Sequence, residues 1–211
     1  MRRTQVFFGI AMLAILVMST AVLTSSTAAD YSKVGVKKGV TATYSYALIG
    51  SKVNKATFRF VNVTGTLVQV IDTFYNPDGS VNGTEFSLVS NVSTGQYGIY
   101  EFLICANLAA NDPIYIGAPF AINETISMNA GGATRTVNHI NATFYGSRVN
   151  EWWDKQTGIM VKLVAGAQNF TLTSTSLWSP DITLLIISGV VVAVAVIAAV
   201  ALLVRRHRRF K

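Results

Sequence analysis

Few residues of this 211-residue chain have the chemistry of a catalytic or metal site. The sequence has two histidines, His139 and His207, and a single cysteine, Cys105. A Ser-His-Asp arrangement would have to use His139, yet no G-x-S-x-G nucleophile elbow occurs. One histidine and one cysteine in the same region cannot supply the four ligands of a structural zinc site. We therefore expect no catalytic residue, no metal site and no cofactor, with His139 an ordinary strand residue and Cys105 a small buried side chain.

Carboxylates offer two weaker possibilities. Asp72, Asp78 and Glu85 flank one predicted turn, but they lack the alternating oxygen-ligand spacing of a calcium loop, so we expect them to be solvated turn carboxylates. Glu151 and Asp154 could act as the acid pair of a glycosidase. Because they bracket a second predicted turn, we expect them to be solvated groups that keep this turn polar. A hydrolase is therefore the least favoured function.

Three tryptophans are the remaining candidates for contacts. Trp152 and Trp153 are adjacent in a predicted strand, so their side chains should point to opposite faces of a sheet. Packing is the favoured role for both, but the one outside the core could contact a ligand, a sugar or a partner. Trp178 lies four residues before a long apolar run and is expected at a membrane interface.

Asparagines form an excess of glycosylation triplets. The region 30–181 has 13 Asn and 28 Ser or Thr, from which chance gives about two Asn-X-Ser/Thr triplets, yet it contains six. Polar strand and turn composition is the alternative explanation. We expect at least two of the six to carry glycans. The candidate acceptors are Asn62, Asn82, Asn91, Asn123, Asn141 and Asn169.

The elements that must position these residues are strands. Val68, Val70, Asp72 and Phe74 alternate with Leu67, Gln69, Ile71 and Thr73, which is a period of two. The turn sequence Asn-Pro-Asp-Gly at 76–79 predicts that residues 66–75 and 84–90 form a hairpin. A second hairpin should turn at residues 154–158. We predict an all-β, mainly antiparallel domain of roughly eight to ten strands, as a curved sheet or half-open barrel, with a β-sandwich as the alternative.

Both ends of the chain predict membrane topology. Residues 1–29 have the basic, apolar and small-residue parts of a secretory signal peptide, although an uncleaved signal anchor remains an alternative. Residues 182–204 are 23 uncharged positions, 15 of them Leu, Ile or Val, which is enough for one transmembrane helix. A basic tail, 205–211, follows and is expected in the cytoplasm. Its arginines, predicted at the membrane interface, are Arg205, Arg206, Arg208 and Arg209.

Charge divides in the same way. The formal charge of +7 comes entirely from the two ends, because residues 30–181 hold ten basic and ten acidic side chains. A basic patch for nucleic acid is therefore unsupported. The exported domain is 30–181, and its partners are expected to be the membrane and an envelope protein, a glycan or an apolar ligand, while the oligomeric state stays open.

An ordered set of short motifs resembles uncharacterised, membrane-anchored archaeal surface proteins. The motifs are Val34–Gly39, Asn76–Gly79, Ala106–Leu108 with Asp112-Pro113, Arg135–Asn141, Trp153–Ile159 and Leu177–Pro180. The hairpin at 153–159 is also similar to that of bacterial lipoprotein-carrier (LolA-like) and periplasmic stress-sensor domains, which implies a half-open barrel around an apolar cavity. The first resemblance implies a cell-surface protein without an assigned activity.

The sequence as a whole favours a glycosylated cell-surface protein, not an enzyme, in which one C-terminal helix holds a binding or envelope-structural β domain. The alternative is a LolA-like carrier or sensor of an apolar ligand, such as a lipid or a lipidated protein. An open apolar cavity of several hundred Å³ inside the sheet would favour the alternative.

Overall fold

A computed structural model describes residues 28–96, 102–144 and 146–179. The predicted transmembrane span 182–204, the basic tail and nearly all of the predicted signal peptide lie outside these residues. Within them, no helix occurs that has the length and apolar character needed to cross a membrane.

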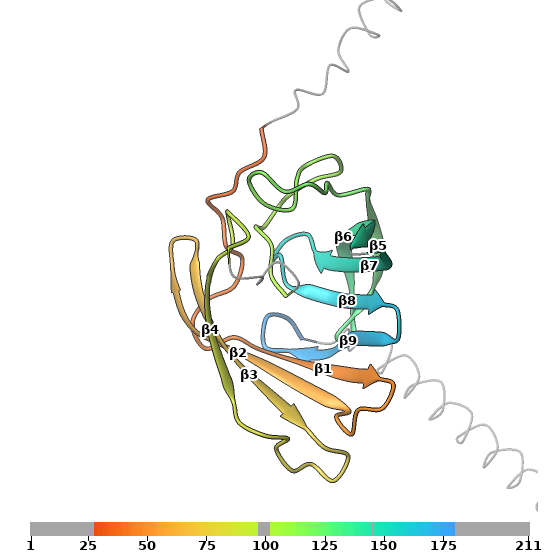
Figure 1. Ribbon diagram of the computed structural model, residues 1–211. Coiled ribbons are helices and arrows are strands. Elements are labelled where there is room, and N and C mark those ends of the chain that lie inside the picture. The colour runs from red at the N-terminus through yellow and green to blue at the C-terminus, as the bar shows by residue number, and fades with distance from the viewer. Residues whose placement is uncertain (1–27, 97–101, 145, 180–211) are drawn as a thin grey trace, which may run out of the picture.

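The described residues form one antiparallel sheet of nine strands in the order β4-β3-β2-β1-β9-β8-β7-β6-β5 (Figure 1). Strands β4 and β5 are its two edges, so the sheet is open and not a closed barrel. The prediction of an all-β, antiparallel domain is confirmed. The strands are β1 (Thr41–Leu48), β2 (Lys55–Thr64), β3 (Leu67–Tyr75), β4 (Phe86–Asn91), β5 (Glu124–Ala130), β6 (Ala133–Phe144), β7 (Ser147–Asp154), β8 (Met160–Ala165) and β9 (Gln168–Thr175).

Both predicted hairpins are present. Strands β3 and β4 pair from Leu67↔Asn91 to Asp72↔Phe86 on either side of the Asn-Pro-Asp-Gly turn. Strands β7 and β8 pair around the turn at 154–158. The centre of the sheet is not a hairpin, because β1 pairs with β9, which is the last strand among the described residues.

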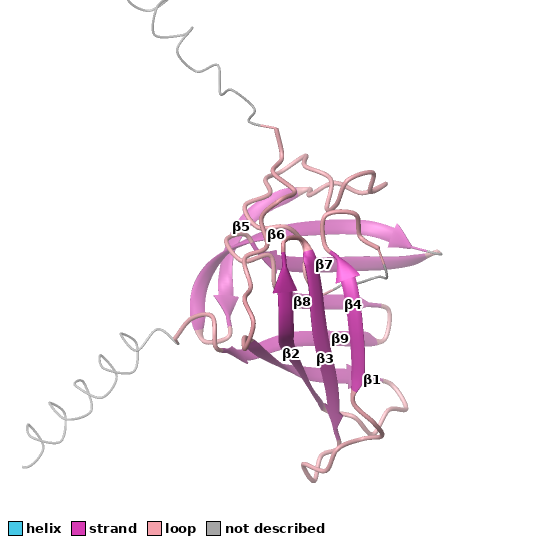
Figure 2. Ribbon diagram, turned by 90° about the vertical axis from the view of Figure 1, so that its left-hand side faces the viewer, coloured by secondary structure: helices cyan, strands magenta, loops and turns pink. Residues whose placement is uncertain are grey.

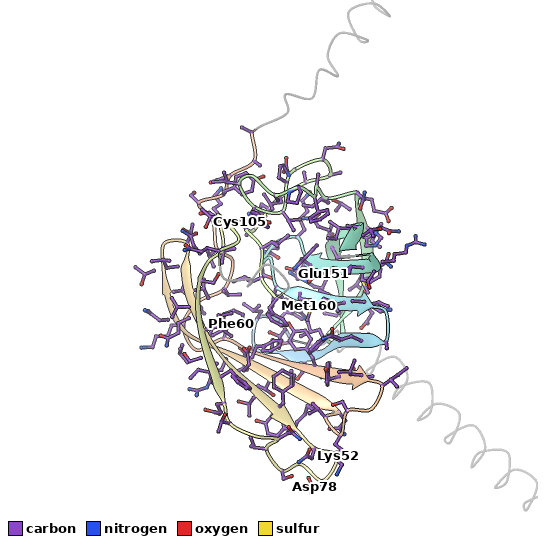
Figure 3. All side chains as sticks on the ribbon, in the orientation of Figure 1. Lys52, Phe60, Asp78, Cys105, Glu151 and Met160 are labelled. Atoms are coloured by element: carbon purple, nitrogen blue, oxygen red, sulfur yellow. The ribbon has the colours of Figure 1, made fainter. Side chains whose placement is uncertain are left out.

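The sheet bends strongly, so that β2, β3 and β4 cross in front of β8, β9 and β1 (Figure 2). The core fills the space enclosed by this bend. Tyr44 and Phe58 have ring centroids 5.0 Å apart, and Tyr44 donates a hydrogen bond to the main-chain oxygen of Met160 across the core, at 2.9 Å. Figure 3 shows Phe60 and Met160 on facing sides of the enclosed space.

The segment 102–122, which has no long strand, closes the interior. Its backbone continues the sheet pairing next to β8, because Ile104 N donates to the oxygen of Gly158 at 2.9 Å and Met160 N donates to the oxygen of Phe102 at 2.9 Å. The Phe102 ring lies 4.4 Å from the Phe58 ring. Apolar side chains of the segment are almost fully buried; they are Leu103, Ile104, Cys105, Leu108, Ile114 and Ile122. The interior of the bent sheet is therefore packed with side chains.

Candidate functional site

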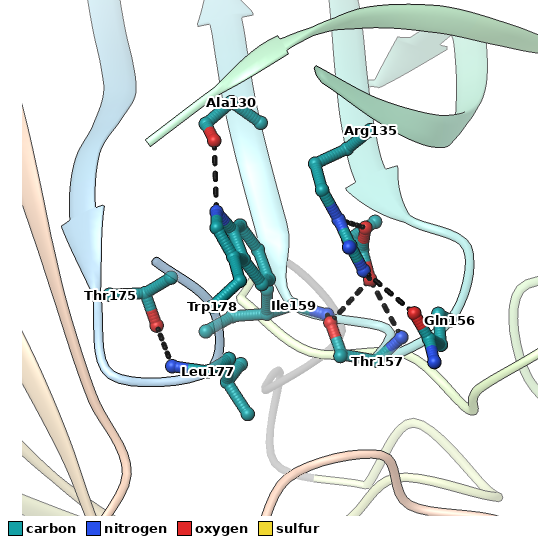
Figure 4. A network of polar contacts seen from close by, with 9 residues as sticks. Ala130, Arg135, Gln156, Thr157, Ile159, Thr175, Leu177 and Trp178 are labelled. Carbon is teal, nitrogen blue, oxygen red and sulfur yellow. Dashed lines mark hydrogen bonds and ion pairs between the residues drawn. The ribbon is translucent and has the colours of Figure 1, made fainter. Parts of the chain in front are cut away.

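The turn at 154–158 is built around one buried carboxylate. Asp154 is 1% exposed. Its Oδ1 accepts hydrogen bonds from Thr157 N and Thr157 Oγ1, at 2.8 and 2.7 Å, and its Oδ2 accepts one from Arg135 Nε at 2.8 Å (Figure 4). A charged group removed from water needs such partners. The turn is therefore held by the side chain that begins it.

Two glycines allow this turn to dock on the rest of the domain. Gly158 has φ +75°, and a Cβ there would collide with the oxygen of Ile104. Gly35 lies so close that a Cβ would collide with the backbone of Thr157. Glycine alone fits both positions. The segment that contains Gly35 and the 102–122 segment can therefore approach the turn closely from two sides. The motif at 153–159 is thus a structural junction of three chain segments.

Arg135 of β6 is fixed in place beside the turn. Besides Asp154, its Nη2 donates to Gln156 Oε1 at 2.9 Å. Its Cζ lies 4.5 Å from the centroid of the Trp178 ring, and Trp178 Nε1 in turn donates to the oxygen of Ala130 at 3.0 Å (Figure 4). Nη1 takes no part in the hydrogen bonds recorded for the described residues, so its two donors are available to a ligand.

A polar cleft of about 300 Å³ adjoins this guanidinium. Its walls contribute two cations and one carboxylate, so the lining has one excess positive charge. The remaining lining side chains are amides and hydroxyls that donate and accept hydrogen bonds. The lining residues are Asn107, Thr134, Arg135, Thr136, Asp154, Lys155 and Gln156. Such a cleft can bind a small polar or acidic group.

A wider cleft of about 750 Å³ lies between the β1–β2 loop and the β3–β4 connection. Lys52 and Asp78 mark this end of the domain in Figure 3, whereas Cys105 lies toward the opposite end. Asn76 and Asn82 line the cleft and are hydrogen-bonded to each other at 2.7 Å. Most of the lining residues have polar side chains, and no buried ionisable group is among them. We therefore regard the Arg135 cleft as the better-organised site.

Trp152 and Trp153 point to opposite faces of the sheet, as predicted. Trp153 is 0% exposed and belongs to the main core. Trp152 is half-buried in a second apolar cluster on the other face, where its ring stacks on His139 with centroids 4.5 Å apart and an interplanar angle of 6°. His139 Nδ1 lies 2.9 Å from Glu124 Oε1. Neither tryptophan borders the two clefts.

All six asparagines of the glycosylation triplets lie at or near the surface. Five are exposed, and Asn91 is half-buried. Its Oδ1 accepts hydrogen bonds from the N–H and hydroxyl of Ser93, the third residue of its triplet, at 3.1 and 2.8 Å. The side chain of Asn82 is engaged by Asn76, as described above. None of the six lies in the main core.

The carboxylates differ from expectation. Glu151 and Asp154 are 2% and 1% exposed, so the prediction that they are solvated is wrong. Asp72 points into the enclosed side, and burial raises its pKa to about 6. The expectation that Asp72 is a solvated turn carboxylate is therefore wrong; its period-two alignment with Val68 and Val70 was the signal that could have indicated its burial. Asp78 and Glu85 are exposed, as expected, and the Asp78 Oδ1 accepts hydrogen bonds from Ser80 N and Oγ.

The described residues bring together no group of three or more His, Cys, Asp and Glu that could hold a metal ion. Asp72, Asp78 and Glu85 are separated: Asp72 lies inside, Asp78 is in the exposed turn, and Glu85 accepts a hydrogen bond from Thr73. Cys105 is buried, as predicted, and burial raises the pKa of its thiol to about 11. It is therefore a packing residue and a poor nucleophile.

Comparison with known proteins gives limited similarity. No protein-family model matches the sequence, and no curated protein matches it. Similar solved structures are a crystal structure of MucB, with 12% identity and a TM-score of 0.39, and one of MucB in complex with MucA(peri), with 12% identity and a TM-score of 0.36. They cover 72% and 68% of this chain. The chain spans a little over half of these structures, 57% and 54% of their lengths.

Proposed function

We propose that this chain is a single-pass, N-glycosylated membrane protein whose β domain lies outside the cell and binds a polar ligand of the envelope in the Arg135 cleft. The ligand carries a carboxylate, as an acidic glycan does. The observation that carries this proposal is the guanidinium of Arg135, which Asp154, Gln156 and Trp178 hold in one orientation beside a polar cleft. A side chain fixed before binding loses little entropy when the ligand arrives.

Charge supports an acidic ligand. Asp154 offsets the charge of Arg135, and Lys155 then leaves the cleft lining with one net positive charge. Two donors of Arg135 remain to form charge-assisted hydrogen bonds with a carboxylate. We propose that the domain binds and does not catalyse, because residues 30–181 contain one histidine, His139, and no G-x-S-x-G nucleophile elbow.

Binding can be tested by titrating the full chain in detergent micelles with glucuronate, with glucose as the neutral control. Lys155→Gln removes one cleft charge and leaves the Arg135–Asp154 pair intact, so it should weaken glucuronate binding several-fold. Lys52→Gln, at the other cleft, is the matched control and should leave the affinity unchanged. Equal binding of glucuronate and glucose, or no binding at all, would contradict the acidic-ligand proposal.

Export and glycosylation rest on the predicted signal peptide, the predicted span and the surface positions of the six triplets. Mass spectrometry of the chain from cells that make it should find glycan on at least two of these asparagines. A Thr143→Ala substitution should remove any glycan from Asn141 and leave the others. A chain without glycan on these asparagines would contradict the proposed glycosylation. A chain that retains residues 1–29 would contradict cleavage of the signal peptide.

The alternative function is a LolA-like carrier or sensor of an apolar ligand. It requires an apolar cavity, whereas side chains such as Phe102 and Leu103 fill the enclosed side of the sheet. A carrier would therefore have to open by displacing the 102–122 segment. Binding of a fluorescent fatty acid that glucuronate does not displace would favour this alternative.

A further inference from the structure

The C-terminal residues of the described chain are fixed on the domain. Ser176 N donates to the oxygen of Thr41 and Thr41 N donates to Ser176 Oγ, both at 3.0 Å. Two residues later, Trp178 is held by its bond to Ala130 and by the Arg135 guanidinium above its ring. Thus β9 does not run into a free linker within the described residues.

This docking limits the distance between the domain and a membrane. Three residues, 179–181, separate Trp178 from residue 182, where the predicted span begins. Trp178 and residue 182 are therefore four Cα steps apart, which reach at most about 14 Å when fully extended. Given the proposed membrane anchoring, the face that holds Thr41, Ser176 and Trp178 must lie within about that distance of the bilayer surface.

Basic residues gather on this face. Arg59 is the cross-strand partner of Thr41, and Gly39 N donates to the oxygen of Phe60 at 2.8 Å, which places Lys37 and Lys38 beside the same point. All three basic side chains are exposed, and none takes part in the ion pairs recorded for the described residues. Segments 37–41, 57–61 and 174–179 carry these three charges and no acidic residue. We call Lys37, Lys38 and Arg59 the basic exit patch.

We propose that the basic exit patch binds anionic head groups of the membrane that holds the chain, so that the domain rests on the bilayer with this face down. The proposal rests on the proposed membrane anchoring. Three positive charges on a domain that is neutral on balance face the one surface that the docked C-terminal residues bring close. Electrostatic attraction acts over about 8–10 Å at physiological salt, which lies within the reach of this short link. Each basic residue near an anionic surface contributes roughly fivefold to the binding equilibrium.

The test uses the full chain reconstituted in vesicles of phosphatidylcholine, alone or mixed with phosphatidylglycerol. A water-soluble amine-acetylating reagent labels exposed lysines, and mass spectrometry measures the rate at each. We expect labelling of Lys37 and Lys38 to fall at least about fivefold when phosphatidylglycerol is present, and to recover in high salt. Lys52 is the internal control, because it follows the far end of β1, about 25 Å from Thr41 at the rise of a strand, and its rate should not change.

Flotation of the vesicles in alkaline carbonate separates the two possible failures. A chain that does not float with the vesicles contradicts the anchoring and, with it, the proposed contact. A chain that floats but whose Lys37 and Lys38 are labelled equally in both kinds of vesicle contradicts the contact alone. Equal slowing of Lys37, Lys38 and Lys52 would also overturn it, since that result means general charge attraction without a defined face.

Discussion

The half-buried carboxylate of Asp72 should make the domain less stable as the pH rises. Asp72 lies on the enclosed face of β3, and its Oδ1 is buried without a hydrogen-bond partner among the described residues. Burial raises its pKa from 3.8 to about 6. A raised carboxyl pKa means that the folded state holds the proton more tightly than the unfolded chain does. The folded state is therefore penalised once the group ionises, through the window from about pH 4 to about pH 6.

The size of this effect follows from the shift. A shift of about two units corresponds to about 3 kcal/mol of lost unfolding free energy at full ionisation, and to about 2–3 kcal/mol between roughly pH 4 and roughly pH 8. Solvent screening of a partly accessible group makes this an upper estimate. For a domain of this size such a loss lowers Tm by several degrees.

Urea unfolding of the full chain in detergent, followed by tryptophan fluorescence, measures the effect. Asp72→Asn places a neutral isostere at the site, and the cost of burying its amide does not depend on pH. The difference in unfolding free energy between variant and wild type should therefore shift in favour of the variant by about 2–3 kcal/mol from about pH 4 to about pH 8. Asp78→Asn is the control, because Asp78 is exposed and its bonds to Ser80 lower its pKa. A variant that keeps the wild-type pH dependence would refute the argument.

Three further predictions concern the packing around the 154–158 turn. Gly158→Ala should lower the free energy of unfolding, measured by chemical denaturation, by more than about 3 kcal/mol. Gly146→Ala is the control, because Gly146 has φ +80° and open space around it, and should lower it by only about 1 kcal/mol. Equal losses would mean that the turn is not tightly docked. Asp154→Ala should cost about 3–5 kcal/mol, and a double-mutant cycle with Arg135→Met should give a coupling of at least about 1 kcal/mol; independent effects would contradict the ion pair. Tyr44→Phe should cost about 1–2 kcal/mol because it leaves a buried main-chain carbonyl unpaired, and a loss below about 0.5 kcal/mol in thermal unfolding would show that water replaces the hydroxyl.

Sequence alone predicts the parts of the fold that depend on local chemistry. Period-two alternation around Phe74 and the turns at 76–79 and 154–158 correctly predict two hairpins, and adjacency correctly places Trp152 and Trp153 on opposite faces. The pairing of β1 with β9 was not predicted, because no local signal records a contact between residues about 130 positions apart.

The candidate site was predicted less well. A carboxylate in a turn is exposed by default, and Asp154 departs from this because Arg135, 19 positions earlier, supplies its counter-charge. Glu151 is buried in the middle of β7, where Ile140 of β6 and Leu163 of β8 are its cross-strand neighbours, and these pairings join residues that are distant in the sequence. The cleft beside Arg135 exists only where β6, the turn and Asn107 meet.

The central position of β9 determines when the sheet can be completed during synthesis of the chain. Strands β1–β4 and β5–β9 can each zip up from consecutive hairpins as they are synthesised, which is fast because the contacts are local. The two halves join only when β9 reaches β1, and β9 ends at Thr175, shortly before the predicted span at 182. A nascent chain that stalls before this point exposes the unpaired edge of β1 and an unfinished core, a state prone to aggregation. If the chain is exported and anchored as we propose, the sheet is completed only shortly before the predicted span at 182 enters the export machinery.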